Sequence, residues 1–168
     1  MSASFDSSQF RKVVSRFVTG ITVVTTRMGD EIHGMTANAF CSVSLTPPSI
    51  LVCLARNSRT AALVEQSRIF AVNILSDRQT LHSDRFAGRH KEKEANRFEE
   101  IEWTTAVTGA PILAGSLAFL DCKLTSVFDG HSHLLCLGEV VAADTDEALP
   151  PLIYHQSRYL TLEQTKTV

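Results

Sequence analysis

The segment that most limits the fold of this chain is residues 117–142. Its first half alternates between apolar and polar side chains, the pattern of a strand with one buried face. Asp129-Gly130 is typical of a tight turn, and an apolar strand is predicted from Ser132 to Ala142. Two such strands joined by a tight turn pair antiparallel. On one face of the first strand we place Ala118, Leu120, Cys122 and Leu124, and on the other Asp121, Lys123 and Thr125.

Other short apolar segments predict more strands of the same kind. The run Ile50–Ala55 predicts a strand buried on both faces, and Pro47 and Pro48 before it should interrupt sheet pairing. About six or seven strands with short connections favour an antiparallel barrel over a parallel β–α–β sheet. We predict the remaining strands at 21–26, from Ile32 onward, and at 69–75, 103–107 and 152–162, with an irregular segment at 111–115.

Helices are predicted between some of these strands, so the fold class is mainly β with inserted helices. Ser58 is a suitable N-cap for a helix carrying Ala61 to Val64, and Asp77 for one carrying Leu81 and Phe86. The charged residues 88–102 predict a mobile connection. The first helix has an apolar face of Phe10, Val13, Val14 and Phe17, with Asp6, Ser7 or Ser8 as N-cap and Gly20 as left-handed C-cap.

Length and charge exclude several classes of protein. We interpret the 168 residues, 1–168, as a single domain. The net charge of −2 and the absence of a basic stripe argue against a nucleic-acid partner, and no apolar run is long enough to span a membrane. Without a secretory signal, a cytoplasmic protein is expected. The four cysteines lie among apolar residues, which predicts buried, reduced thiols.

Gly34 to Thr60 contains two polar segments on either side of the apolar run. In the first, small residues such as Ala37 and Ala39 leave room for backbone N–H groups to reach the edge of a flat ligand such as a flavin. A half-buried strand with a wet face is the alternative that spacing alone favours. The second segment, Asn57-Ser58-x-Thr60, stands at a helix start, where an anion is favoured. Arg56 or Arg59 would complete a phosphate site, but an ordinary N-cap is the more common outcome.

Few other motifs carry chemistry. There is no G-x-G-x-x-G, P-loop or G-x-S-x-G motif. His131 and His133 share a strand face and would suit a metal together with Asp121 or Glu139. We predict no metal site, because no further ligand cluster accompanies them; two histidines at a hairpin end are the alternative. The last polar and aromatic group consists of Tyr154, His155, Arg158 and Tyr159.

Taken together, these segments resemble the short-chain flavin reductases, the reductase components of two-component flavin monooxygenases. The resemblance covers nearly the whole chain. It implies a split β-barrel of the FMN-binding type that forms a homodimer and reduces FMN or FAD by hydride transfer from NADH or NADPH. It also implies a partner monooxygenase that receives the reduced flavin by diffusion. The segments that carry it are FRKVVSRFVTGITVVTT, GMTANAFCSVSLTPPSILVCL, NSRT, FAVNIL, RFAG, GSLAFLDC, HLLCLGEV and PLIYHQSRY.

The resemblance also implies roles for individual residues. His133 matches the histidine of a G-D-H motif near the nicotinamide, and here is the expected catalytic residue. The motif reads His131-Ser132-His133 in this chain, so its glycine and carboxylate are lost. Tyr154 and Arg158 are expected to bind the nicotinamide together with His133. The expected flavin-binding residues are Thr36, Ala37, Asn38, Ala39, Ser42, Val43, Ser44, Leu54, Ala55, Arg56, Asn57, Ser58, Thr60, Arg85, Phe86 and Ala87.

Two other functions are compatible with the same barrel. One is a non-catalytic flavin- or haem-binding module, and the other is a reductase of a bound corrinoid. A flavin reductase needs no protein nucleophile, because the cofactors carry the electronic chemistry. This explains a predicted site of backbone, threonine, serine and asparagine without a pair of charged catalytic groups.

Overall fold

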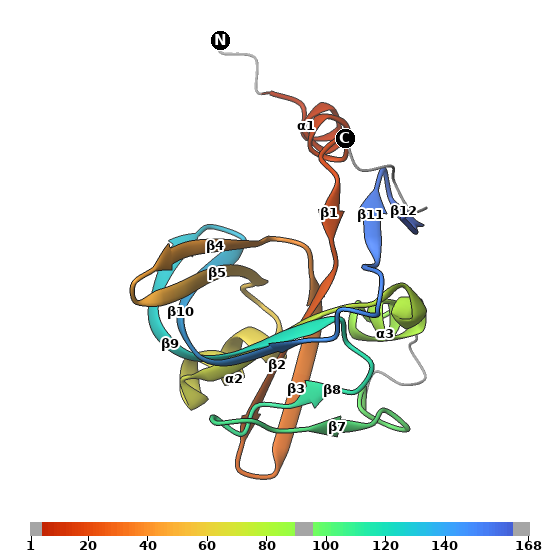
Figure 1. The fold of residues 1–168 in the computed structure, drawn as a ribbon. Coiled ribbons are helices and arrows are strands. Elements are labelled where there is room, and N and C mark those ends of the chain that lie inside the picture. Colours follow the sequence, from red (N-terminus) through yellow and green to blue (C-terminus); the bar gives the residue numbers. More distant parts are fainter. Residues whose placement is uncertain (1–4, 90–95, 163–168) are drawn as a thin grey trace.

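The computed structural model describes residues 5–89 and 96–162 of the chain. Its main element is a seven-stranded sheet in which every neighbouring pair is antiparallel, in the order β3-β2-β6-β9-β10-β5-β4 (Figure 1). In chain order the strands are β2 (Thr22–Met28), β3 (Glu31–Ala37), β4 (Phe40–Leu45), β5 (Pro48–Ala55), β6 (Ile69–Ile74), β9 (Ala118–Gly130) and β10 (His133–Thr145).

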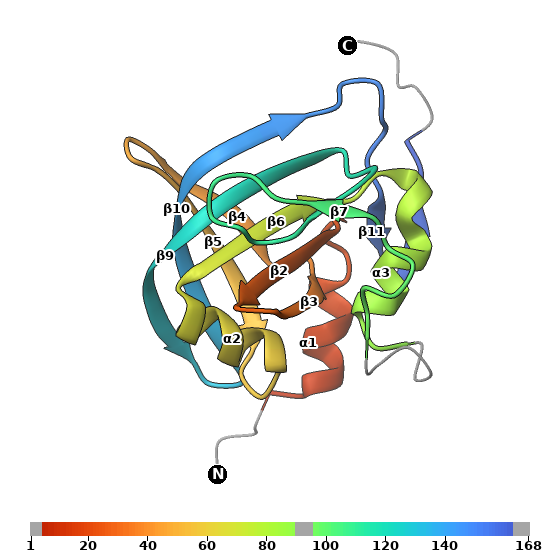
Figure 2. The ribbon, with the colours of Figure 1, turned by 90° about the horizontal axis from the view of Figure 1, so that it is seen from below.

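The two edges of this sheet are consecutive in the chain. Strands β3 and β4 stand at opposite ends of the order, yet only Asn38 and Ala39 join them. The sheet therefore curls until its edges approach each other, as Figure 2 shows from below. The carbonyl oxygen of Ala39 accepts a hydrogen bond of 3.0 Å from the N–H of Cys53 on β5. This is the antiparallel split barrel that the sequence predicted.

The remaining elements lie around the barrel. Strand β1 (Thr19–Gly20) pairs with β11 (Ile153–His155), which pairs with β12 (Arg158–Leu160). Helix α1 projects away from the barrel beyond this small sheet (Figure 1). No helix in the described ranges is both long and apolar enough to cross a membrane. The helices are α1 (Ser7–Val14), α2 (Arg59–Ser67) and α3 (Thr80–Phe86), with a 3₁₀ turn η1 (Asp77–Gln79) before α3. Two further short strands, β7 (Trp103–Thr104) and β8 (Ile112–Leu113), pair with each other.

The core has two main clusters, separated by the sheet. The first fills the barrel and includes Val24, Phe70 and Leu54. The second lies under α3 and includes Val23 and Phe86. Because successive strand residues point to opposite faces, Val23 and Val24 of β2 enter different clusters.

The burial of the strand faces differs from the prediction. On β5 alternate residues are buried, but Leu51, Cys53 and Ala55 on the outer face are only half-buried. The prediction of a strand buried on both faces is therefore wrong for β5; β2 and β6 have that environment instead. The double proline does not interrupt the sheet, because Pro48 begins β5 and pairs with Leu45.

The helix predictions were confirmed in part. Asp6 and Ser58 are N-caps of α1 and α2, and the Ser58 hydroxyl accepts a 3.1 Å bond from the N–H of Ala61. Asp77 is not a cap: it begins a 3₁₀ turn whose N-cap is Ser76, and the N-cap of α3 is Gln79. Helix α1 ends before Phe17, and Gly20 lies in β1 instead of capping the helix.

Turns and polar positions needed further corrections. The β9–β10 turn is His131-Ser132, because Gly130 already pairs with His133. Asp121 is buried rather than facing solvent, since its carboxylate accepts bonds from the N–H groups of two residues. Cys41 is exposed, contrary to expectation. Strand β7 is shorter than predicted, and its partner β8 forms in the segment expected to be irregular. Of the predicted mobile connection, residues 90–95 lie outside the described ranges.

Candidate functional site

Strand β3 brings the two polar segments of Gly34–Thr60 together. The Ser58 hydroxyl lies 3.4 Å from the sulfur of Met35, and His33 Nδ1 lies 2.8 Å from the hydroxyl of Thr60. The first turn of α2 therefore runs along one face of β3. These contacts place the two segments side by side.

The charges at the start of α2 are largely paired. Burial lowers the pKa of His33 to about 4, with further lowering by Arg97 and Arg59, so the imidazole is neutral at neutral pH. Arg59 binds Glu31 at 2.7 Å, and Arg56 binds Asp129 at 2.5 Å. Both guanidiniums predicted to hold a phosphate thus already have carboxylate partners.

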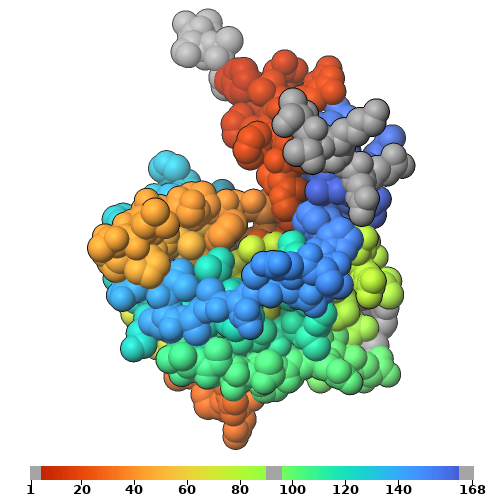
Figure 3. Space-filling model, in the orientation of Figure 1, coloured from red at the N-terminus to blue at the C-terminus, as the bar shows by residue number. Residues whose placement is uncertain are grey.

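A cavity of about 150 Å³ lies on the other face of β3, between this strand, α3 and the small sheet. Thr36 and Asn38 line it from the β3 side, and Tyr154 lines it from β11. A second cavity of about 240 Å³ beneath α1 shares Asn38 and Tyr154 with it. Figure 3 shows a hollow between the β4–β5 hairpin and the projecting β1 and α1. The remaining residues that line the first cavity are Ile21, Ser83, Ala87, Arg89 and Tyr159.

A hydrogen-bond network fixes one wall of this cavity. The Tyr159 hydroxyl lies 2.5 Å from Asp84 Oδ1 and 2.9 Å from the Ser83 hydroxyl, which joins the β11–β12 hairpin to α3. Burial raises the pKa of Tyr159, and the bond to Asp84 raises it further. The Thr36 hydroxyl donates to the carbonyl oxygen of the same Ser83 at 2.6 Å. The cavity therefore has walls of defined position.

Four of the predicted residues line this cavity: Thr36, Asn38, Ala87 and Tyr154. Phe86 does not, because its ring lies in the core under α3 and is 1% exposed. A Cβ atom at Gly34 would lie 3.0 Å from that ring, so the glycine allows the close packing. Phe86 was expected at the flavin, but its ring instead packs against β3 in the core.

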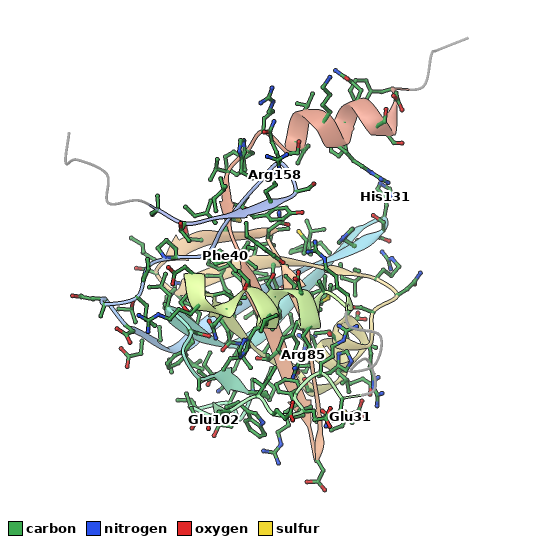
Figure 4. All side chains as sticks on the ribbon, turned by 90° about the vertical axis from the view of Figure 1, so that its right-hand side faces the viewer. Glu31, Phe40, Arg85, Glu102, His131 and Arg158 are labelled. Carbon is green, nitrogen blue, oxygen red and sulfur yellow. The ribbon has the colours of Figure 1, made fainter. Side chains whose placement is uncertain are left out.

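The other predicted flavin-binding residues lie outside the cavity. The side chains of Leu54 and Thr60 are fully buried, and Ala37 is also buried. Arg85, labelled in Figure 4, donates to the carbonyl oxygen of Glu99. The rest stand on the exposed β3–β4 junction and β4 edge, on the end of β5, or at the start of α2: Ala39, Ser42, Val43, Ser44, Ala55, Arg56, Asn57 and Ser58.

Two of the expected nicotinamide-binding residues are not at the cavity. His133 is exposed at the start of β10, opposite Ala55, with its Nδ1 atom 2.9 Å from the Ser132 hydroxyl. Arg158 is exposed beside Tyr159 on β12, and adjacent strand residues point to opposite faces. Figure 4 shows Arg158 on the side of the barrel toward α1.

Sequence reasoning missed Ile21, Ser83, Arg89 and Tyr159. The signal for Tyr159 was present in the final aromatic group, where it pairs with Tyr154 across a hairpin. Arg89 stood at the start of the charged run that predicted a mobile connection. Among the described residues, no group of three or more His, Cys, Asp or Glu is placed to hold a metal ion.

Comparisons with known proteins give a consistent result. Residues 14–163 match the family model described as the flavin reductase like domain. The chain is 38% identical over 165 residues to the reductase subunit HsaB of a flavin-dependent monooxygenase from Rhodococcus jostii, covering 98% of this chain and 83% of that protein. It is 34% identical to the reductase component of 4-hydroxyphenylacetate 3-monooxygenase from Thermus thermophilus, covering 91% of this chain and 95% of that one.

A solved structure supports the same assignment. The NADH:FAD oxidoreductase SgcE6 of Streptomyces globisporus, in complex with NAD and FAD fragments, has a TM-score of 0.87 at 33% identity, covering 95% of this chain and 94% of that one. Since the family model and the relatives span nearly the full length, they confirm the resemblance predicted from the motifs. The chain belongs to the flavin reductase-like family.

Proposed function

We propose that this protein is an NADH- or NADPH-dependent flavin reductase that supplies reduced FMN or FAD to a separate monooxygenase. The observation that carries the proposal is the cavity at the end of β3, where Thr36, Asn38 and Tyr154 meet. These three residues were expected at the flavin or the nicotinamide. The names of the relatives, which include NADH-dependent FAD and FMN reductases, support the same activity.

The residues present suit a flavin. Asn38 and Ala39 are exposed at the junction of the two edge strands, where little side-chain bulk covers the backbone. The Asn38 carboxamide offers both donors and an acceptor to the polar edge of the ring system. Tyr154 and Tyr159 leave aromatic surface in the cavity for the second planar ligand, the nicotinamide. The start of α2, with its Ser58 cap, suits the phosphate.

The protein's contribution to the reaction is positioning. A bound flavin accepts electrons from the nicotinamide and carries them to an acceptor. The chain would bind and orient the two ligands and restrict water around them, using the wall fixed by Tyr159, Asp84 and Ser83. His133 is exposed at the start of β10, outside the cavity, so the role proposed for it is to position the ribose beside the nicotinamide rather than to abstract a proton.

A homodimer is part of the proposal. Helix α1 has no buried residues, and its apolar face leaves Phe10 57% and Val13 58% exposed. Val43 and Leu45 on β4 are 54% and 91% exposed. Apolar surface of this extent is typical of an interface, and a second copy that covers both regions would also enclose the open side of the site.

The proposed partner is a flavin-dependent monooxygenase that receives reduced flavin by diffusion. The names of relatives that are reductase components of such enzymes support this partner. We propose a cytoplasmic location, and the four free cysteines agree with a reducing compartment.

The test of the activity is oxidation of NADH by the purified protein with and without FMN or FAD. Oxidation that requires added flavin, with many turnovers of flavin per protein, supports the proposal. Flavin binding without NADH oxidation would favour the non-catalytic module, and reduction of a corrinoid in preference to flavin would favour the third function.

The role of His133 has its own test. Replacement by alanine, H133A, should raise KM for the nicotinamide or slow flavin reduction more than it weakens flavin binding. Stopped-flow measurement of the reductive half-reaction separates these effects. An unchanged half-reaction would remove His133 from the site.

A further inference from the structure

The cavity at the end of β3 has a single charged lining residue, Arg89, among the described residues. Its Nη1 atom lies 2.6 Å from Asp84 Oδ1, and the centre of its guanidinium lies 5.9 Å from the centroid of the Tyr159 ring. The arginine side chain is nevertheless 53% exposed. The guanidinium is thus held in a fixed place and still faces outward.

The contacts of Arg89 leave part of its hydrogen-bonding capacity unused. In the part of the chain that the structure describes, its bonds to Asp84 and to the Tyr159 hydroxyl both use Nη1. A guanidinium carries five N–H donors in a fixed plane and is matched to phosphate oxygens. A ligand in the cavity can therefore reach a positioned, phosphate-binding group.

Arg89 and the predicted flavin phosphate site lie on opposite faces of β3. His33 and Met35 contact the start of α2, whereas Thr36 contacts α3. Since neighbouring strand residues point to opposite faces, α2 and α3 lie on opposite faces of β3. A flavin phosphate at α2 would lie away from Arg89, which leaves the arginine to another anion.

We propose that Arg89 binds the pyrophosphate of the nicotinamide dinucleotide. This inference rests on the proposed reductase function, because it takes the dinucleotide as the second substrate. The cavity provides aromatic surface from Tyr154 and Tyr159 for the nicotinamide ring, and Arg89 provides charge beside it for the phosphates. Asp84 and Tyr159 fix the guanidinium in advance, so that less conformational freedom is lost on binding.

The experiment compares two electron donors. NADH carries the pyrophosphate, whereas 1-benzyl-1,4-dihydronicotinamide has the reducing ring and no phosphate. With flavin saturating, R89Q should raise KM for NADH about tenfold to a hundredfold, as expected for loss of a charge-assisted bond. The same variant should use the phosphate-free donor as well as the unmutated protein does. The KM for NADH of R89K should lie between those of R89Q and the unmutated protein.

The matched control is R27Q, which also removes an exposed arginine paired with a carboxylate, here Asp30 in the β2–β3 hairpin. It should leave KM for NADH within about twofold, because long-range charge effects are screened. The KM for NADH should also rise less steeply with salt in R89Q than in the unmutated protein.

Three outcomes would overturn the proposal. An equal loss with both donors would mean that Arg89 acts through the shape of the site. A raised KM for flavin with an unchanged KM for NADH would assign it to the flavin, and no change in either would remove it from the site. Failure of the proposed function is distinguishable, because the unmutated protein would then oxidise neither donor with flavin.

Discussion

Strands β2 and β6 are covered on both faces, whereas β5 is covered on only one and β4 has no buried residue. On β2, Val24 points into the barrel and Val23 into the cluster under α3. On β5, Val52 is fully buried, but the outer face beside it is half-exposed, and β4 leaves Leu45 91% exposed. Both pairs belong to one sheet.

This difference divides the sheet into strands whose apolar side chains are buried within the chain and strands that leave apolar side chains exposed. The covered strands bury enough apolar surface to define the fold. The open strands and helix α1, which also buries no residue, lie on either side of the hollow in Figure 3, so apolar side chains are exposed on this side of the molecule. The candidate site stands at the border between them, because Asn38 and Ala39 join β3 to β4.

The largest effect is expected on the covered side. Phe70 on β6 is fully buried in the barrel, and its ring packs against Gly138, where an added Cβ would lie 2.4 Å from the ring. F70A should lower the free energy of unfolding by about 3–5 kcal/mol. Chemical denaturation at fixed protein concentration measures it. A loss below about 1 kcal/mol would mean that the covered strands do not dominate stability.

The second effect concerns the open side. L45E places a charge on β4 at a position proposed to be covered by a second copy. It should weaken dimerisation about thirtyfold, or roughly 2 kcal/mol, because a buried unpaired charge is costly. Sedimentation over a range of concentrations measures the dissociation constant. The matched control is M28E, at a 49% exposed position in the β2–β3 hairpin. Equal effects of both variants would contradict an interface at β4.

The sequence predicted local features, such as helix caps, better than it predicted which strand faces are buried. Ser58 was predicted as a cap because a helix start depends on neighbours a few residues away, and its hydroxyl does accept the bond from Ala61. The antiparallel barrel followed from alternation and short connections. Whether β2 or β5 is buried on both faces depends on which elements pack over them, and the apolar run of β5 gives no sign of that.

The candidate site was predictable only in part, for a similar reason. Thr36, Asn38 and Tyr154 were named from motifs and do meet at one cavity. Phe86 was named from the same motifs, but spacing does not distinguish a ring that lines a cavity from one behind it. Arg89 was hidden in a charged run, and only the contact with Asp84 and Tyr159 shows that it is held at the cavity.

The third prediction tests β3, which lies between the covered and open sides. In the folded protein the pKa of His33 is about 4, below its ordinary value of 6.5. The imidazole therefore stays neutral in the folded state while the unfolded state gains a proton as pH falls from 6.5 toward 4. Stability should fall over that window, by roughly 1–2 kcal/mol after allowing for partial exposure, and stay flat above it. The free energy of unfolding of H33Q, measured as a function of pH, should lack this fall. If H33Q and the unmutated protein had the same pH profile, His33 would be excluded as the source of the fall.

The smallest effect separates the two roles of Ser58 at the start of α2. S58A removes the bond to the N–H of Ala61 and should cost about 1 kcal/mol of stability, whereas S58D keeps an N-cap and should cost little.

If a flavin phosphate binds here, the added carboxylate of S58D repels it and should weaken FMN binding about tenfold, because like charges within a few ångströms disfavour each other. Riboflavin lacks the phosphate, so its binding should be unchanged in the same variant. Fluorescence titration with both ligands measures the difference. If S58D weakens both equally, or neither, the phosphate does not lie at this helix start, and Ser58 serves only to begin α2 beside Met35.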